Sequence, residues 1–289
     1  MQYDVVIIGG GVAGLTAGLY CARGGKSTLI IENSNLGGIT ATLDKIENYP
    51  AFSGTGEELI NKLVEQAMSF GVNFEYTNIE SIDFASKSLV LSDGQIYGYK
   101  ALIVASGVTY RKLGIEGENA FKNKGISYCA TCDGRLYKDK DVIVITNGFV
   151  GHKDIEYLRA LAKKVYVLDI SEEYVNREVE IYHGVKIKKI FGIDSVGGII
   201  FERYGKDVIL HADGIFICLG KESDVSLFDG KLTLNGNKIV TDENMHTNID
   251  GVYAVGDIRD KKLRQIVTAC SDGAIAGSEA IGFINKTNN

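Results

Sequence analysis

Two cysteines separated by two positions, Cys129 and Cys132, have the most distinctive chemistry in the chain, and Asp133 follows them directly. Two thiols at this spacing can close a small disulfide ring and exchange two electrons as a dithiol. Asp133 could be a plain turn residue, but we favour a general acid that protonates a leaving thiolate. The motif therefore predicts disulfide redox chemistry at residues 129–133.

Two other interpretations of the cysteine pair stay open. The pair could be half of a zinc site, which would need two further ligands, or it could be two inert thiols. Cys21, Cys218 and Cys270 are isolated in the sequence, and the four histidines show no H-x-x-x-H pattern. We therefore expect no metal site, and we expect the three isolated cysteines to be core or packing residues.

A glycine-rich turn near the N-terminus is placed to bind a dinucleotide. It lies between a strand expected at 4–8 and a helix expected at 15–23, and the next strand, 27–31, ends at an acidic residue. Such glycines let the backbone approach a pyrophosphate at a helix N-terminus, and the acid can accept hydrogen bonds from a ribose. The alternative is a purely structural turn. The predicted binding residues are Gly9, Gly11, Ala13, Gly14 and Glu32.

A second motif, near the C-terminus, favours FAD over NAD. Residues 247–257 predict a strand that ends in Gly256 and Asp257. This segment resembles the second FAD fingerprint of flavoprotein disulfide reductases, in which the aspartate binds the ribityl and pyrophosphate region. Alone, the Gly-Asp pair would indicate a turn, but together with the N-terminal glycines it predicts bound FAD.

The length and the strand patterns predict two nucleotide-binding folds. A chain of 289 residues suggests about two domains. A second β-turn-α-β pattern consists of a strand at 141–145, a helix at 151–162 and a strand at 164–168 that ends at Asp169. The expected fold class is α/β, with two Rossmann-like domains. Shorter strand patterns, expected to be additions to the sheets, lie at 73–92, 185–202 and 206–218.

The composition excludes several classes of protein. Lys and Arg number 31 and Asp and Glu number 37, so the net charge of −6 argues against a generally basic nucleic-acid binder. The hydrophobic fraction of 45% is ordinary for a soluble globular protein. No apolar run approaches the roughly 18 residues of a membrane span. The N-terminus enters a strand pattern at once, so we expect no targeting peptide and a cytoplasmic location.

Over nearly its whole length the chain resembles the low-molecular-weight thioredoxin reductases. The sequence Cys-Ala-Thr-Cys-Asp-Gly at 129–134 lies between two nucleotide folds, as it does in that family. Segments 37–40 and 46–50 are similar to the family's flavin-proximal segments, and 105–107 is similar to its Ala-Thr-Gly strand end. Segments 257–260 and 264–269 are similar to its C-terminal flavin-binding segment. The resemblance implies further flavin contacts at Gly37, Gly38, Ile39, Thr40, Asn48, Gly107, Gly256, Asp257, Arg264, Gln265 and Ile266.

The resemblance also implies a homodimeric FAD protein that reduces thioredoxin. Its FAD-binding domain would be discontinuous, formed by 1–113 and 244–289. The inserted domain, 114–243, would carry the redox pair on a degenerate NAD(P)-binding fold. In the family the second cysteine faces the flavin, which corresponds to Cys132. The inserted domain would rotate about its two links, with freedom supplied by the glycines near 114–117.

The second glycine loop departs from the pattern of NADPH-dependent members. Those have G-x-G-x-x-A and a His-Arg-Arg set, whereas this chain has Thr-Asn-Gly-Phe-Val-Gly at 146–151 and Asp-Ile-Ser at 169–171. Thr146 is penalised where a glycine would adopt positive φ. No arginine is available for a 2′-phosphate, and Asp169 would repel it. NADH stays an alternative, because Asp169 could hold a ribose 2′-OH.

A flavin protein without a nicotinamide site needs another electron source. Because the NADPH motifs are missing, the chain resembles one branch of the family in particular, the ferredoxin-dependent flavin thioredoxin reductases, in which reduced ferredoxin is the electron donor. The alternatives are an NADH-dependent thioredoxin reductase and a non-catalytic flavin redox sensor. Ferredoxins are usually acidic, so we expect a local basic patch, with ordinary solvated charge as the alternative for each candidate. The candidates are Lys122, Lys124, Arg135, Lys138 and Lys140; Lys186, Lys188 and Lys189; and Arg259, Lys261 and Lys262.

Overall fold

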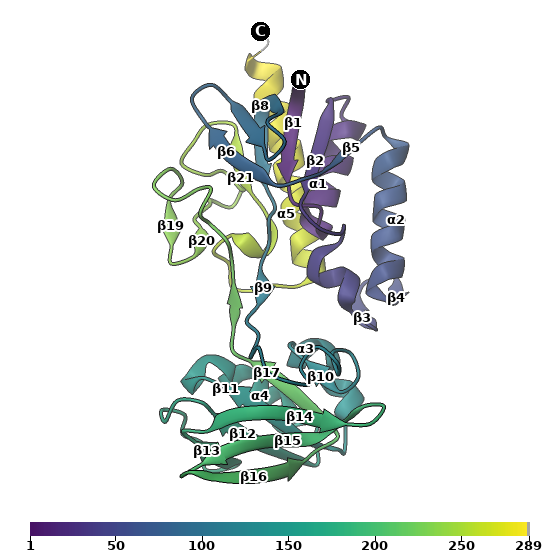
Figure 1. Ribbon diagram of the computed structural model, residues 1–289. Coiled ribbons are helices and arrows are strands. Elements are labelled where there is room, and N and C mark those ends of the chain that lie inside the picture. The colour runs from purple at the N-terminus through teal and green to yellow at the C-terminus, as the bar shows by residue number, and fades with distance from the viewer. Residues whose placement is uncertain (288–289) are drawn as a thin grey trace. The chain divides into compact units, whose positions relative to one another are not determined.

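The computed structural model describes residues 1–287, which form two compact units (Figure 1). Unit 1 contains Met1–Thr109 and the chain from Glu222 to the end of the C-terminal helix α5 (Ile266–Thr287). Unit 2 is Tyr110–Lys221. The predicted α/β class with two parallel-sheet units is confirmed.

Unit 1 is built on a seven-stranded sheet in the order β5-β2-β1-β8-β7-β6. One half of β8 pairs with β7 in antiparallel fashion, and its C-terminal half pairs with β21 in parallel. Strands β1, β2, β5, β8 and β21 are parallel, so their carboxyl ends meet at one edge, where ligands of such sheets bind. The strands are β1 (Gln2–Ile8), β2 (Thr28–Glu32), β5 (Asn73–Tyr76), β6 (Ile79–Asp83), β7 (Ser88–Leu91), β8 (Ile96–Val104) and β21 (Val252–Ala254).

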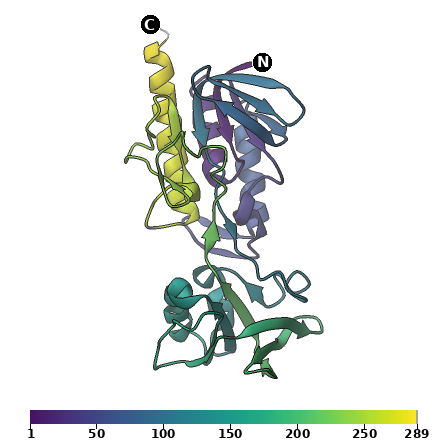
Figure 2. The same ribbon diagram turned by 60° about the vertical axis from the view of Figure 1, so that its left-hand side comes forward.

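The helix that follows the glycine turn, α1 (Val12–Arg23), packs against α5, which runs along unit 1 (Figure 2). Small residues allow this approach, because a Cβ at Gly273 would lie 2.3 Å from the Ala13 carbonyl oxygen. Helix α2 (Gly56–Ser69) begins with a capping box formed by Thr55 and Glu58. The remaining short elements of unit 1 are β3 (Ile46–Tyr49), β4 (Phe52–Gly54), β19 (Leu234–Asn235), β20 (Lys238–Ile239) and 3-10 turns at Gly38–Thr42 and Gly256–Ile258.

Unit 2 combines a parallel sheet, β10-β17-β11-β12-β13, with an antiparallel sheet, β14-β15-β16. Side chains of β11 alternate between two cores: Ile143 packs with Phe201 of β15, and Val144 packs with Ile155 of α4. The elements are β10 (Ile126–Ser127), α3 (Ala130–Asp133), β11 (Asp141–Thr146), α4 (His152–Arg159), β12 (Lys164–Asp169), β13 (Glu180–His183), β14 (Lys186–Gly192), β15 (Val196–Arg203), β16 (Lys206–His211) and β17 (Gly214–Cys218), with 3-10 turns at Gly134–Tyr137 and Gly148–Gly151.

Some elements differ from their predicted bounds. The helix expected at 151–162 is only α4, preceded by the 3-10 turn Gly148–Gly151. The segment 206–218 divides into β16 of the antiparallel sheet and β17 in the middle of the parallel one. Within residues 1–287, no helix combines the length and apolar character that crossing a membrane requires.

The second boundary between the units lies at 221/222 rather than at the expected 243/244, and the first lies at 109/110 rather than 113/114. Residues 222–243 belong to unit 1 because Phe228, Leu232 and Ile239 are buried in one core with side chains of β7 and β8. Local sequence patterns do not reveal such long-range packing.

The glycines near 114–117 are not free to act as a hinge. The amides of Leu113 and Gly114 donate to the carboxylate of Glu118 at 3.1 and 2.7 Å. Glu118 is buried and also accepts from the Tyr128 hydroxyl at 2.7 Å. A Cβ at Gly117 would lie 2.1 Å from the Ile190 carbonyl oxygen. This segment is therefore bound to unit 2, and the chain crosses between units at β9 (Thr109–Tyr110) and β18 (Lys221–Glu222), which pair with each other.

Truncation of Phe228 tests the assignment of residues 222–243. Phe228→Ala leaves a cavity in the core of unit 1, so we expect a loss of about 3–5 kcal/mol of stability. Native-state hydrogen exchange should accelerate in β7 and β8 and stay unchanged in β11 and β12. Phe216→Ala, in the core of unit 2, is the matched control with the opposite pattern. Acceleration confined to unit 2 after Phe228→Ala would contradict the assignment.

Candidate functional site

Cys129 and Cys132 are joined by a disulfide on the single turn α3 of unit 2. Their Cα atoms are 5.3 Å apart. The amides of Cys132 and Asp133 donate to the Cys129 carbonyl oxygen at 3.2 and 3.1 Å, which closes the turn. Ala130, between the cysteines, is fully buried, whereas both cysteines are half-buried. The turn is therefore anchored in the unit 2 core by its inner residue.

A buried hydroxyl, Ser127, connects two parts of the redox motif. Its Oγ accepts from the Cys129 amide at 3.1 Å and donates to Oδ2 of Asp133 at 2.6 Å. Sequence analysis did not single out Ser127. The available signal was a polar residue in an apolar strand segment, two positions before Cys129. The hydroxyl of Thr131 lies 3.5 Å from Cys129 Sγ, within reach of a thiolate there.

Asp154, on the first turn of α4, lies beneath the redox turn and was also missed. Its carboxylate accepts a hydrogen bond from the Ala130 amide. Burial raises the pKa of Asp154, partly offset by that hydrogen bond and by the charge of Lys221. The carboxylate thus ties α4 to the turn that carries the disulfide.

The N-terminal glycine turn of unit 1 has the geometry of a dinucleotide cradle. Gly9 has φ of 103°, and a Cβ there would lie 2.4 Å from the Ala105 carbonyl oxygen. A Cβ at Gly14 would lie 2.0 Å from the Gly9 carbonyl oxygen, so only glycine fits. At Gly11, by contrast, no non-neighbouring atom of residues 1–287 lies within 4 Å of a built Cβ. The backbone is therefore open to an anion at the N-terminus of α1. Glu32 accepts from the Gly10 amide at 2.8 Å, which places its carboxylate at this turn.

The structure brings together several of the predicted flavin-binding segments. The Gly37 amide donates to the Gly10 carbonyl oxygen at 2.8 Å. A Cβ at Gly256 would lie 2.9 Å from the Cβ of Ala13, so the two fingerprints touch. The Asn48 amide donates to the Gln265 side-chain oxygen at 3.0 Å. The other predicted residues lie on the same segments or at the end of β8: Gly38, Ile39 and Thr40 in a 3-10 turn, Gly107 after β8, Asp257 after Gly256, and Arg264 and Ile266 on either side of Gln265.

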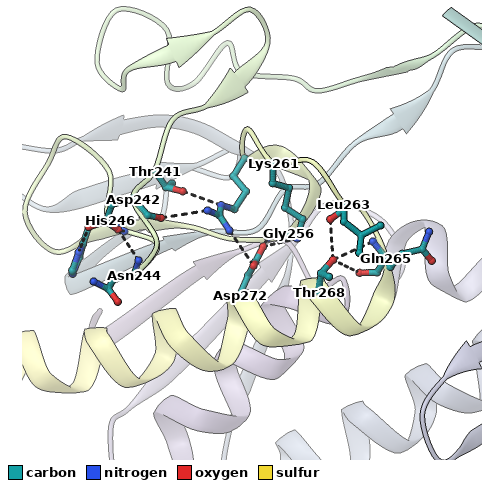
Figure 3. Close-up of polar contacts among 11 residues, drawn as sticks. Thr241, Asp242, Asn244, His246, Gly256, Lys261, Leu263, Gln265, Thr268 and Asp272 are labelled. Atoms are coloured by element: carbon teal, nitrogen blue, oxygen red, sulfur yellow. Dashed lines mark hydrogen bonds and ion pairs between the residues drawn. The ribbon is translucent and has the colours of Figure 1, made fainter. Parts of the chain in front are cut away.

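An ion-pair cluster around Asp272 of α5 holds the second fingerprint in place (Figure 3). Asp272 is 5% exposed and accepts from the Gly256 amide at 2.9 Å. It pairs with Arg259 at 3.1 Å and with Lys261 at 2.7 Å. Arg259 also donates to the Thr241 hydroxyl at 2.9 Å. The loop that carries Asp257 is thereby fixed to the start of α5.

The residues of unit 1 fit FAD. Gly11 leaves space for a pyrophosphate. The buried Nε of Arg264 has no hydrogen-bond partner among residues 1–287, although a buried polar atom ordinarily has one. A bound group with acceptor oxygens would satisfy it.

The corresponding loop of unit 2 satisfies its own polar groups. The buried Oγ1 of Thr146 accepts from the Gly151 amide at 2.9 Å and donates to the Gly148 carbonyl oxygen at 3.0 Å. Asp169 is fully buried and accepts from the amides of Gly148 and Tyr174 at 2.9 and 3.0 Å. Burial opposes ionisation of Asp169, but these backbone hydrogen bonds together with the side chains of Ser171 and His183 outweigh burial and lower its pKa.

The two loops differ at the position that would face a pyrophosphate. A Cβ at Gly148 would lie 3.2 Å from a carboxylate oxygen of Glu173, whereas Gly11 faces open space. Helix α4 begins four residues after Gly148, whereas α1 begins immediately after Gly11. The NADH alternative relied on Asp169 as a ribose acceptor, but its carboxylate is buried and engaged by its own chain.

The three candidate basic patches differ in how much of their charge is paired. In the third patch, Arg259 and Lys261 are bound to Asp272, and only the exposed Lys262 forms no ion pair within residues 1–287. Lys188 pairs with Glu202 and Asp207, and Lys189 pairs with Glu116. In the patch around the redox pair, four exposed side chains form no ion pair with any residue in the range 1–287: Lys122, Lys124, Arg135 and Lys138.

The isolated cysteines are located as expected for packing residues. Burial raises the pKa of the Cys21 thiol to about 12 and also raises that of Cys218. Cys270 is half-buried and receives a contact from the Tyr49 hydroxyl at 3.9 Å. Across the described range, 1–287, no cluster of three or more His, Cys, Asp or Glu side chains is arranged to hold a metal ion.

The chain matches the family model described as pyridine nucleotide-disulphide oxidoreductase over residues 3–273. It is 34% identical to thioredoxin reductase of Bacillus subtilis, covering 98% of this chain and 95% of that protein. The thioredoxin reductase structure from Streptococcus pyogenes superposes with a TM-score of 0.93 at 34% identity, covering 99% of each chain. A ferredoxin-flavin thioredoxin reductase structure from Clostridium acetobutylicum gives a TM-score of 0.57 at 29% identity, covering 100% of this chain and 99% of that one.

Removal of the Asp169 carboxylate should destabilise unit 2. Asp169→Ala leaves several buried donors unsatisfied, which predicts a loss of about 3 kcal/mol. The folded pKa lies below the ordinary 3.8, so the stabilisation is present above pH 3.8 and is lost as the pH falls through the lowered value. Chemical denaturation at several pH values measures the difference from wild type. Ser171→Ala, which removes one donor to Asp169, is the milder control. An equal effect of both variants, or a difference that shrinks already near neutral pH, would contradict this role.

Proposed function

Since the chain belongs to the pyridine nucleotide-disulphide oxidoreductase family and is a thioredoxin reductase-type flavoprotein, we propose that it reduces the disulfide of thioredoxin with electrons from reduced ferredoxin. Reduction of the thioredoxin disulfide is supported by the disulfide on α3, which is a two-electron redox pair. This pair belongs to unit 2, whose glycine loop is not open to a dinucleotide. Ferredoxin as the electron donor is supported by the loop at 146–151, whose polar groups are already hydrogen-bonded to residues of the same chain.

The cysteine pair performs the exchange with the substrate. A thiolate of the reduced pair attacks one sulfur of the thioredoxin disulfide and forms a mixed disulfide, and the other substrate sulfur leaves as a thiolate. The second cysteine then attacks the mixed disulfide, which restores the Cys129–Cys132 bond and releases dithiol thioredoxin. Thr131 is placed to donate to a thiolate at Cys129. Asp133 supplies a proton to a departing thiolate, and the resemblance assigns Cys132 as the flavin-side sulfur.

FAD is the cofactor of this family, and the predicted residues of unit 1 would hold it. Gly11 and the N-terminus of α1 would receive the pyrophosphate, Glu32 the ribose, and Asp257 the ribityl region. Bound FAD can accept electrons singly and pass them on in pairs, which suits a donor that delivers one electron at a time.

The donor assignment is supported by the chemistry of the loop in unit 2. A dinucleotide would meet Glu173 opposite Gly148, and like charges repel at close range. No arginine stands at 169–171 to bind a 2′-phosphate. The similarity to a ferredoxin-flavin thioredoxin reductase agrees with a donor other than a nicotinamide.

An acidic protein partner is supported by the unpaired charges near the redox pair. Lys122, Lys124, Arg135 and Lys138 flank the redox pair in the sequence, are exposed and form no ion pair within residues 1–287, on a chain whose net charge is −6. Such a patch raises the association rate with an acidic protein and makes that rate fall with added salt. The homodimer that the resemblance implies and the cytoplasmic location expected from the N-terminal sequence stay predictions.

The donor is identified by steady-state reduction of thioredoxin with a single reductant in each assay. We expect turnover with reduced ferredoxin, and neither turnover nor bleaching of the flavin absorbance with NADPH or NADH under anaerobic conditions. Reduced methyl viologen, a small one-electron donor that needs no docking surface, is the positive control. Rapid bleaching by NADH would overturn the ferredoxin assignment in favour of an NADH-dependent reductase.

Replacement of either redox cysteine separates catalysis from cofactor binding. Cys129→Ser and Cys132→Ser should abolish thioredoxin reduction and retain FAD, because the predicted FAD residues belong to unit 1 and the cysteines to unit 2. Activity assays and the flavin absorbance of the purified variants measure the two effects. Cys270→Ser, at a cysteine without an assigned role, should keep its activity. Loss of flavin from the redox variants would count against this division. A wild-type protein that reduces no thioredoxin with any donor would favour a redox sensor.

A further inference from the structure

We propose that Ser127 is a positioning residue for Asp133, whose carboxyl group it orients to protonate the thiolate released from the disulfide substrate. This inference rests on the proposed function of the redox pair and adds a residue that neither the motif nor the resemblance identified. It is carried by a hydrogen-bonded chain from the Cys129 amide through the Ser127 hydroxyl to the Asp133 carboxylate.

The position of Ser127 is unusual for a hydroxyl. It is 4% exposed and ends β10, which pairs with β17 in the parallel sheet of unit 2. Its backbone is therefore held by the sheet, whereas Asp133 lies six positions further along, at the end of the redox turn. The 2.6 Å contact between Ser127 Oγ and Asp133 Oδ2 thus connects the end of a sheet strand to the acid next to Cys132.

The direction of the hydrogen bonds gives the serine its function. The Cys129 amide can only donate, so it occupies a lone pair of Ser127 Oγ. The hydroxyl proton then has two acceptors within reach, and Asp133 Oδ2 at 2.6 Å is much nearer than the Cys129 carbonyl oxygen at 3.4 Å. In a buried site each bond of such a chain polarises the next. A donor to the carboxylate stabilises its ionised form and keeps the Asp133 pKa lower than it would be without the serine.

The proton transfer belongs to the first exchange step. The attacking cysteine thiolate forms a bond to one substrate sulfur, the substrate S–S bond breaks, and the leaving sulfur takes the electron pair of that bond. Asp133 gives its proton to this sulfur and becomes a carboxylate, which the Ser127 hydroxyl stabilises. The second cysteine then loses its proton to Asp133 and attacks the mixed disulfide. The Cys129–Cys132 bond forms, the mixed disulfide bond breaks, and the second substrate sulfur leaves as a thiolate with the electron pair of that bond. The two electrons pass from the cysteine pair to the substrate.

The test uses two disulfides that differ in how much their leaving group needs a proton. The holoenzyme is reduced with dithionite, freed of excess reductant, and mixed with hydroxyethyl disulfide or with a nitrobenzoate disulfide, whose aromatic thiolate leaves without protonation. Single-turnover oxidation of the cysteine pair is followed across pH for wild type, Ser127→Ala, Asp133→Asn and the double variant. Ser171→Ala is the matched control, because it removes another serine that donates to a carboxylate of unit 2, at 2.9 Å.

We expect Ser127→Ala to slow the reaction with hydroxyethyl disulfide by about tenfold, a part of what general acid catalysis contributes. The reaction with the nitrobenzoate disulfide should change little. The alkaline limb of the pH profile should move to higher pH, because Asp133 loses a donor to its ionised form. Ser127→Ala should add nothing in the Asp133→Asn background, Ser127→Thr should restore the rate, and Ser171→Ala should match wild type.

Equal slowing with both disulfides, an unmoved pH limb, or a further loss in the Asp133→Asn background would overturn the proposal. If Ser127→Ala does not fold, Ser127→Val replaces it with the same expectations, since valine has the shape of threonine but no hydroxyl donor. The assay needs neither thioredoxin nor a natural donor. A protein that shows the expected pattern but fails to reduce thioredoxin would therefore overturn the proposed function and leave the role of Ser127 standing.

Discussion

The backbone amides at the two strand-to-helix turns require hydrogen-bond partners, and the two units meet this requirement to different extents. In unit 1, Glu32 accepts from the Gly10 amide. Around Gly11 the backbone faces open space, so a ligand anion can complete the turn. Around Gly148 the chain supplies its own acceptors, Asp169 and Thr146. A buried carboxylate that already holds four donors from its own chain has no capacity left for a ribose. The same β-turn-α-β motif thus leaves room for a cofactor in unit 1, whereas in unit 2 its polar groups are bound within the chain and the motif supports neighbouring elements.

The β-turn-α-β motif of unit 2 positions the redox pair. Helix α4 follows the self-satisfied loop and packs beneath α3, where Asp154 receives the Ala130 amide. Strand β10 leads into the same turn from the parallel sheet, and Ser127 at its end binds both Cys129 and Asp133. Two elements of the degenerate nucleotide fold therefore orient the disulfide and its neighbouring acid. This arrangement gives the second fold a function that does not require a nucleotide.

Similarity over almost the whole chain, with a TM-score of 0.93 to one thioredoxin reductase, identifies the scaffold and the disulfide chemistry. It does not specify the electron donor, because a fold accommodates different partners through changes at individual sites. Here those changes are local: a threonine in place of a turn glycine, an aspartate at the end of β12, and Glu173 opposite Gly148. Each adds a polar or charged group of the protein where a cofactor phosphate or ribose would otherwise be bound.

The sequence alone determined the features that depend on residue type and local spacing. These are the α/β class, the N-terminal glycine turn, the Cys129–Cys132 pair, and the loss of the arginines at 169–171. The tertiary structure decided what depends on contacts between distant segments. It assigned 222–243 to unit 1 through Phe228, bound the supposed hinge to Glu118, and paired Arg259 and Lys261 with Asp272. It also joined Ser127 to Asp133. Local patterns report which groups a segment carries, but only packing determines whether a partner elsewhere in the chain already uses them.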